Sequence, residues 1–277
     1  MSQNLLKMKN MENNNKEENN NQNSNLPKLK SKQLVYKGKF LSYSINNFEV
    51  HKKGQNPINI PYETIDYNSR IFDEKDIQNN FIGKNIYNIY ATTIIPIIKY
   101  SSRPKKIIII SVFRYPQNKF CLEFPGGFMD KGDQPSGGGG SHFMEQVKIA
   151  ALRELEEETG YKGNFICCTS KFFGNNNIED QLKLGGNIFY DPWKSADNSL
   201  QCLVEINGDD INCRKKEQNL DADEFIKVYE VELDNLMEFI NKKMSEEGFG
   251  CSGELYNVAF GINFNKIFNN NSIINSK

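Results

Sequence analysis

The stretch AALRELEEETGY, at residues 150–161, decides the fold and the chemistry expected of this chain. In a helix, Glu154, Glu157 and Glu158 fall at i, i+3 and i+4, so three carboxylates share one face. Apolar side chains lie on the other side, where they would pack against a sheet: Ile149, Leu152 and Leu155. Gly160 occupies the position at which a glycine commonly ends a helix, so we expect the helix to stop there.

Three like charges on one helix face are costly unless a cation neutralises them. Carboxylate oxygens are hard ligands that favour Mg²⁺ or Mn²⁺, and such sites keep coordination positions for substrate phosphates. A solvated acidic face is the alternative interpretation, and the upstream sequence decides against it. There, EFPGGFMD at residues 123–130 predicts a short apolar strand that runs into a Pro-Gly-Gly turn.

At these residues the chain resembles the Nudix hydrolase family. The family signature is Gly, five residues, Glu, seven residues, and then Arg-Glu-apolar-x-Glu-Glu-x-Gly-apolar. Gly127 begins the match, and residues 153–161 complete its second half. Three segments look like the ADP-ribose pyrophosphatases, or ADP-sugar diphosphatases, within that family: CLEFPGGFMD at 121–130, AALRELEEETGYKG at 150–163 and INGDD at 206–210.

The first half of the signature departs from the family pattern. Asp133 replaces the family's glutamate, and 19 residues instead of seven separate it from Arg153. The extra residues include QPSGGGGS at 134–141, which looks like a flexible linker. A longer loop before a helix is tolerated, because the cost of closing a loop grows slowly with its length. The departure therefore affects the expected role of Asp133 and not that of the helix glutamates.

The resemblance implies an α/β fold, namely a Nudix fold in which an α/β/α sandwich is built around a mixed sheet, with a small N-terminal β subdomain. It also implies metal-dependent hydrolysis of the diphosphate of ADP-ribose, or of a related ADP-sugar, to AMP and ribose 5-phosphate. The implied ligands of Mg²⁺, with Mn²⁺ as the alternative, are Gly126 through its carbonyl, Glu154, Glu157 and Glu158. The implied catalytic residues are Glu224 as base or water-orienting group, Glu154, and Arg153, which would hold the helix in place. The implied substrate-binding residues are Arg114, Phe40, Tyr62 and Asp191.

Several of these assignments have a plain alternative in the sequence. Phe40 and Tyr62 would stack on the adenine, but ordinary strand packing explains them equally well. Arg114 follows an apolar strand and suits bidentate phosphate binding, although a surface arginine would look the same. Glu224 is one of several acids in a polar loop, so its role depends on the resemblance alone.

The chain divides into four expected parts. Residues 1–32 are rich in Asn, Lys and Glu and are expected to be a disordered tail, because they cannot bury enough apolar surface. Residues 33–85 would form the N-terminal β subdomain, which contacts adenine and builds a homodimer in the resembled subfamily. Residues 86–264 would be the hydrolase domain, and residues 265–277 a flexible tail.

The alternation of apolar and polar residues predicts the individual elements. The strands expected from this pattern cover 34–45 with a turn at Gly38, 58–65, 88–100, 105–115, 164–173, 200–206 and 226–231. The closing helices are expected at 234–244 and 253–260.

Composition narrows the class of protein. The net charge of −1 over 277 residues gives no electrostatic reason to expect nucleic acid or an acidic membrane as partner. No apolar run is long enough to span a membrane. The six cysteines form no C-x-x-C pair, which favours a reducing compartment. We therefore expect a cytoplasmic enzyme, with the nucleus as the alternative location and a small nucleoside diphosphate sugar as partner.

Two other functions stay open at this point. One is hydrolysis of a different nucleoside diphosphate derivative, such as an oxidised nucleotide. The other is a nucleotide-sugar binding module that does not hydrolyse its ligand, which the interrupted signature would explain. The intact run from Arg153 to Gly160 argues against a pure binder, because binding alone does not require three carboxylates that repel one another.

Overall fold

The structure is a computed structural model that describes residues 27–38, 41–51, 54–67, 91–133, 143–168, 188–189, 198–213, 217–221 and 224–269. Two compact units divide the chain. The smaller unit is Met1–Asn68 with Phe189–Asp197, and the larger is Ser69–Ile188 with Asn198–Lys277. Each unit is described by itself.

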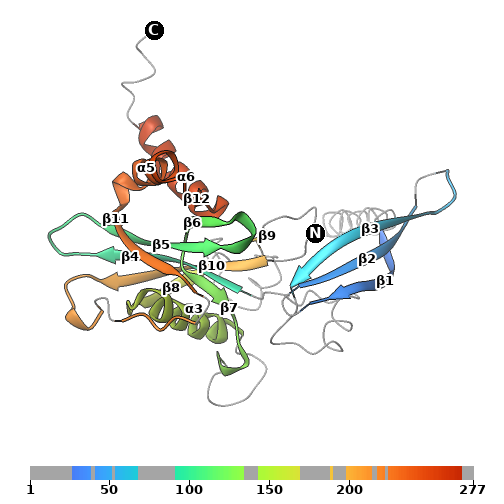
Figure 1. Cartoon of the computed structure of the whole chain (residues 1–277), viewed down its shortest axis with the longest axis horizontal. Helices are drawn as coiled ribbons and strands as arrows, with labels where there is room; N and C mark the ends of the chain where they lie inside the picture. The colour runs from blue at the N-terminus through green and yellow to red at the C-terminus, as the bar shows by residue number, and fades with distance from the viewer. Residues whose placement is uncertain are drawn as a thin grey trace, which may run out of the picture. The chain divides into compact units, whose positions relative to one another are not determined.

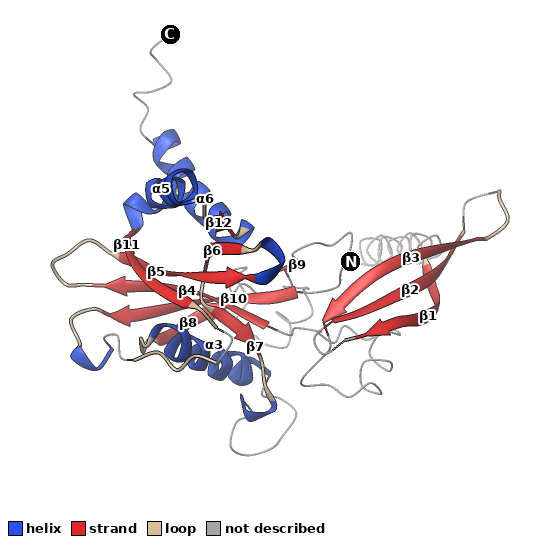
Figure 2. Ribbon diagram, viewed as in Figure 1, coloured by secondary structure: helices blue, strands red, loops and turns tan. Residues whose placement is uncertain are grey.

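The smaller unit contains a three-stranded antiparallel sheet of strands β1 (Lys28–Lys37), β2 (Leu41–Val50) and β3 (Ile58–Tyr67), in that order (Figures 1 and 2). The turn predicted at Gly38 is present, since its N–H donates to the Leu41 carbonyl oxygen. β1 begins at Lys28, inside the segment predicted to be a disordered tail. Pairing with β2 explains this difference, because Lys30 Nζ lies 3.2 Å from Glu49 Oε2 on the neighbouring strand.

The larger unit is built on a nine-stranded mixed sheet (Figure 2). Its strands are β4 (Ala91–Lys99), β5 (Lys106–Arg114), β6 (Lys119–Glu123), β7 (Gly126–Phe128), β8 (Asn164–Cys168), β9 (Ile188–Phe189), β10 (Asn198–Asn207), β11 (Ile226–Glu232) and β12 (Gly250–Cys251). The main order is β12-β6-β5-β4-β10-β8, with β11 paired to β5, β7 to β4 and β9 to β10. The pairs β10–β4 and β12–β6 are parallel, and antiparallel pairs such as β4–β5 and β5–β6 make the sheet mixed.

Helices cover both faces of this sheet. Helix α3 (Phe143–Thr159) lies on one face, and α5 (Leu236–Glu247) and α6 (Gly253–Asn269) lie on the other (Figure 1). Two hydrophobic cores result. Leu155 of α3 is fully buried in one of them, together with Ile98 and Ile108. Ile240 of α5 is fully buried in the other. Burying each such aliphatic side chain stabilises the fold by about 1.5–3 kcal/mol. The predicted α/β/α sandwich with a separate small β unit is confirmed.

The sequence pattern predicts these elements well and their ends less well. Gly160 ends α3 as expected, with a φ of 73° and its N–H donating to the Glu156 carbonyl oxygen at 2.8 Å. Helix α6 continues to Asn269, so it extends into the segment predicted to be a flexible tail. Among the described residues, no helix combines the length and the apolar character that crossing a membrane requires.

Candidate functional site

The carboxylates of α3 face the short strand β7. Gly126 N–H, at the first residue of β7, donates to Glu158 Oε2 at 2.8 Å, and the Glu158 side chain is almost fully buried. β7 is held in this position by the beginning of β4, where Thr93 lies opposite Gly126 and Thr92 opposite Gly127. The Pro-Gly-Gly turn and the helix therefore lie side by side, as the resemblance implied.

Gly127 lets the helix approach β7 closely. A Cβ atom added at Gly127 would lie 2.4 Å from Glu154 Oε1 and 2.5 Å from its Cδ. Real Cβ contacts are not this short, so any larger residue would displace the Glu154 carboxylate. The position of that carboxylate thus depends on the second glycine of the turn.

Arg153 joins the loop before the helix to the carboxylates on it. Its Nε and Nη2 donate to the two Asp133 oxygens at 2.8 and 3.1 Å, and Nη2 also donates to the Phe128 carbonyl. Its Nη1 donates to Glu154 Oε1 and Glu157 Oε2, both at 2.9 Å. These bonds raise the pKa of Arg153, the Asp133 bond most, so the guanidinium stays charged. The pairing of Arg153 with Glu157 is the one that an i, i+4 spacing on a helix permits.

Asp133 is placed despite the long insertion behind it. Its side chain is 1% exposed, and Oδ2 also accepts the Asp130 N–H at 2.7 Å. The short 3₁₀ turn Lys131–Asp133 brings this carboxylate to Arg153. An aspartate therefore makes a bidentate ion pair with the signature arginine, although the family has glutamate at this position.

Two carboxylates of this cluster have raised pKa values because they are removed from solvent. Burial raises the pKa of Glu154 to about 7, and the Glu157 and Glu224 carboxylates add to the effect, while Arg153 opposes it. Burial also raises the pKa of Glu158 well above its ordinary value, against the Gly126 N–H and Arg114. A cation would relieve both costs.

The donor set fits a hard divalent cation, since it consists of carboxylates beside a glycine backbone. Within the described residues, however, no three Asp, Glu, His or Cys side chains already form a ready-made metal cage. The ion pairs of Arg153 with Glu154 and Glu157 explain this arrangement, because they turn two of the carboxylates toward the guanidinium. A bound cation would have to compete with Arg153 for those oxygens.

The loop before β11 is tied to the C-terminal end of α3. The Gln218 side-chain amide donates to the Glu158 carbonyl at 2.5 Å, and Asn219 N–H donates to the Glu157 carbonyl at 2.9 Å. Glu224 follows, with Oε2 accepting the Asp221 N–H at 2.9 Å. After burial, the charge of Glu224 contributes to the raised pKa of both Glu154 and Glu158, so the three carboxylates interact electrostatically. Neither Gln218 nor its capping role was predicted, because such a contact requires the tertiary fold.

Arg114 also interacts with the cluster. It lies at the end of β5, and its Nε and Nη2 donate to the two Glu123 oxygens at 2.8 and 2.6 Å. Its charge opposes the rise that burial causes in the pKa of Glu158, so the guanidinium and this carboxylate interact electrostatically. Glu123 was not predicted as a site residue, although it directly precedes the turn at 124–127.

Three predicted substrate-binding residues stay predictions. Phe40 and Asp191 lie outside the described residues. Tyr62 lies on β3 in the smaller unit with 43% of its surface exposed. Its role in adenine binding stays a prediction.

The sequence is similar to several proteins that are named as pyrophosphatases or Nudix hydrolases. The chain is 30% identical over 173 residues to the ADP-sugar pyrophosphatase of Mus musculus, covering 62% of this chain and 65% of that protein. It is 29% identical over 170 residues to the ADP-ribose pyrophosphatase of Saccharomyces cerevisiae, covering 61% of each. An uncharacterized Nudix hydrolase of Schizosaccharomyces pombe is 26% identical over 175 residues, covering 63% of this chain and 71% of that protein.

The likeness is partial. The matched segments span less than two thirds of the mouse and yeast proteins, and no family model matches the chain. A crystal structure of an ADP compounds hydrolase aligns with 87% of this chain and 95% of its own at a TM-score of 0.44 and 13% identity, a likeness from which nothing further follows. The sequence relatives carry the identification, and they confirm the resemblance seen at residues 153–161. By sequence, this chain is related to the Nudix hydrolases and, among them, to proteins named ADP-sugar and ADP-ribose pyrophosphatases.

Proposed function

We propose that this chain hydrolyses the diphosphate of ADP-ribose, or of a related ADP-sugar, to AMP and ribose 5-phosphate. One observation carries the proposal most directly. Glu158 and Glu154 of α3 lie against the Gly126–Gly127 turn, and Glu224 of a separate loop interacts with them electrostatically. A cluster of this kind suits a cation and a phosphate substrate better than it suits a structural role. The names of the sequence relatives support the substrate class.

The proposed cofactor is Mg²⁺, for which Mn²⁺ can substitute. Glu154, Glu157, Glu158 and the Gly126 carbonyl would hold it. A bound divalent cation neutralises phosphate charge and lowers the pKa of an attacking water, which is the chemistry that a resistant diphosphate needs.

The protein's own residues have distinct proposed tasks. Arg153 positions Glu154 and Glu157 and ties them to Asp133. Glu224 takes or orients the proton of the attacking water. Arg114, aimed by Glu123, binds a phosphate oxygen through its planar guanidinium. The proposed substrate contacts outside this cluster are Phe40, Tyr62 and Asp191.

Replacement of Gly127 by Ala should reduce the rate of hydrolysis about 10- to 100-fold. The added Cβ would displace the Glu154 carboxylate. Misplacement of a functional group by about 1 Å can lower the rate by up to about 100-fold. The measurement is steady-state kinetics with ADP-ribose and Mg²⁺. Gly132→Ala is the matched control, since a Cβ there meets no atom within 4 Å. Equal rates for the two variants would show that hydrolysis does not depend on the exact position of the Glu154 carboxylate.

We also propose that two copies of the chain associate through the smaller unit. Leu29, Phe48 and Ile60 lie opposite one another across the three strands, and Leu29 and Ile60 are 42% and 40% exposed. Neighbouring Ile58 and Tyr62 are exposed to the same degree. A three-stranded sheet with such a face is marginal alone and gains stability when the face is covered.

Ile60→Asp is therefore expected to convert a dimer into a monomer, as measured by light scattering coupled to size-exclusion chromatography. Ile211→Asp, at a position 71% exposed in the larger unit, is the control and should leave the dimer intact. A wild-type protein that is monomeric at micromolar concentration would contradict the proposal.

The proposed location is the cytoplasm, with the nucleus as the alternative. No disulfide joins the cysteines of the described residues, which supports a reducing compartment. The choice of substrate needs a panel that contains ADP-ribose, other ADP-sugars and an oxidised nucleotide. Fastest turnover of the oxidised nucleotide would favour the alternative hydrolase. Tight binding of ADP-ribose without any product would favour the non-hydrolysing module.

A further inference from the structure

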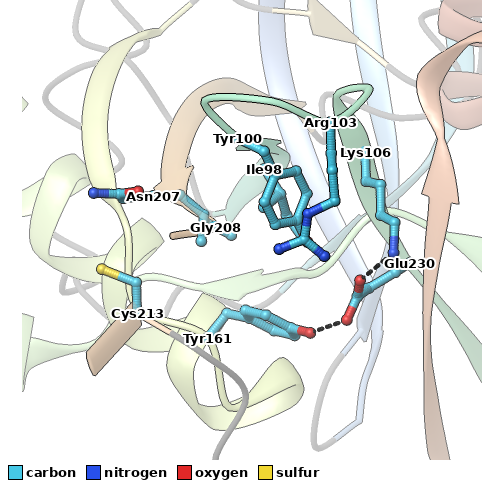
Figure 3. Close-up of a pocket in the computed structure, with 10 residues that line it drawn as sticks. Ile98, Tyr100, Arg103, Lys106, Tyr161, Asn207, Gly208, Cys213 and Glu230 are labelled. Carbon is cyan, nitrogen blue, oxygen red and sulfur yellow. Dashed lines mark hydrogen bonds and ion pairs between the residues drawn. The ribbon is translucent and has the colours of Figure 1, made fainter. Parts of the chain in front are cut away.

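A polar pocket lies at the end of β4 that is farther from the α3 carboxylates. It encloses about 400 Å³ and is lined from several elements, with six residues that matter here: Ile98, Tyr100, Arg103, Lys106, Tyr161 and Glu230 (Figure 3). The carboxylate site uses Thr92 and Thr93, so the two places are separated by five to eight residues along the chain. At about 3.3 Å a residue, this is roughly 15–25 Å. The pocket is a separate site of a size that suits a small metabolite.

An aromatic ring and a guanidinium are held together at one wall. Arg103 Cζ lies 4.3 Å from the centroid of the Tyr100 ring, and Figure 3 shows the guanidinium beside that ring. Gly208 leaves room for the ring, since a Cβ at Gly208 would come within 2.3 Å of it. Stacking on an aromatic ring favours one orientation of the guanidinium and its N–H groups. In the described part of the chain, no carboxylate lies within ion-pair distance of Arg103.

The other charges of the pocket largely cancel. Lys106 Nζ donates to Glu230 Oε2 at 2.8 Å, and the Tyr161 hydroxyl donates to Glu230 Oε1 (Figure 3). The bond to Glu230 raises the pKa of Lys106, which therefore stays charged. Burial, followed by Glu230, raises the pKa of Tyr161, which keeps its proton as a donor. Among the described residues that line the pocket, Arg103 therefore supplies the net positive charge.

The floor of the pocket is apolar. Ile98 and Ile206 are each 1% exposed, and Tyr161 is 5% exposed. A preorganised cation above an apolar floor is the usual composition of a small-molecule site, in which the apolar part supplies affinity and the polar group sets orientation. Arg103 itself is exposed, so a ligand can reach its guanidinium from the solvent.

We propose that this pocket binds a small oxyanion, a phosphate or carboxylate group, at the Arg103 guanidinium. The remainder of the ligand lies over Ile98, Ile206 and the Tyr100 ring. Lys106 adds a second, weaker attraction because Glu230 already neutralises most of its charge. The site is independent of the hydrolytic chemistry proposed above.

The test is isothermal titration of the purified protein with sodium phosphate and with sodium acetate. Chelator and constant ionic strength exclude metal-dependent binding at the carboxylates. Saturable binding of at least one anion is expected, and the stronger of the two identifies the ligand's anionic group. Arg103→Gln should weaken that binding about 10- to 100-fold, the value of a charge-assisted contact. Lys105→Gln, which removes the same charge from the same hairpin outside the pocket, should leave it unchanged.

Glu230→Gln gives a prediction of opposite sign. It removes the pocket's negative charge while keeping an acceptor for Tyr161, so anion binding should tighten several-fold. If Arg103→Gln lowers the melting temperature strongly, Arg103→Lys keeps the charge without the planar donors and should bind more weakly than wild type. No saturable binding of either anion would overturn the proposal. Loss of binding in Arg114→Gln with retention in Arg103→Gln would also overturn it, because the anion would then bind beside the carboxylates.

Discussion

Replacement of Glu158 by Gln should lower kcat with ADP-ribose and Mg²⁺ by more than about 100-fold, and Glu157→Gln should act in the same direction. Either change removes a charged ligand and leaves a side chain of nearly the same size. Glu158 is the more buried of the two, and its amide can still accept the Gly126 N–H. The variants should therefore remain folded, as checked by circular dichroism and melting temperature.

Glu156→Gln is the control on the same helix. Glu156 pairs with Lys162 on the exposed side at 2.9 Å and has no part in the carboxylate cluster. Its rate should stay near that of wild type. Undiminished wild-type activity in excess chelator would exclude the metal role of all three glutamates.

Replacement of Glu224 by Gln should lower kcat about 10²- to 10⁴-fold, the usual contribution of general base catalysis. KM should change little, because the loss is felt in the transition state and not in ground-state binding. The amide keeps an oxygen that can accept the Asp221 N–H, so the loop should keep its shape. Steady-state kinetics at several substrate concentrations separates kcat from KM.

Asp221→Asn and Asp223→Asn are the controls in the same loop, and both should stay near wild type. If Asp221→Asn loses activity while Glu224→Gln keeps it, the base has been placed on the wrong residue. If all three variants remain active, the base lies on α3, and Glu154, with its pKa raised to about 7, is the first candidate.

The helical part of the site could be predicted because its information is local. The spacing of Glu154, Glu157 and Glu158 and the glycine at 160 are properties of one continuous stretch. The central strands were equally predictable, since β4 and β5 are apolar runs bounded by polar residues. The sandwich itself was implied by the family resemblance, and it agrees with the need to cover both faces of such a sheet.

Contacts between distant segments could not be predicted in this way. Gln218 caps α3 from 60 residues away, and Glu123 aims Arg114 across a hairpin. The pocket at Arg103 combines residues from four parts of the chain, and no single stretch of sequence indicates that they meet. β1 also begins earlier than predicted, because its polar residues gain their order from pairing with β2.

At Asp133 the structure shows a contact that the sequence left open. In sequence, the shorter side chain and the long insertion make its role uncertain. In the structure, a 3₁₀ turn delivers its carboxylate to Arg153 in a bidentate pair. The geometry of a short turn compensates for the missing methylene, and local backbone shape of this kind is not encoded in a spacing rule.

The central claim is that this chain is a metal-dependent hydrolase of the ADP-ribose diphosphate. Its most direct test is incubation of the purified protein with ADP-ribose, with Mg²⁺ or with excess chelator, followed by chromatographic quantification of AMP and ribose 5-phosphate. We expect equal amounts of the two products with Mg²⁺ and neither with chelator. Intact ADP-ribose after incubation of folded protein with Mg²⁺ or Mn²⁺ would contradict the claim.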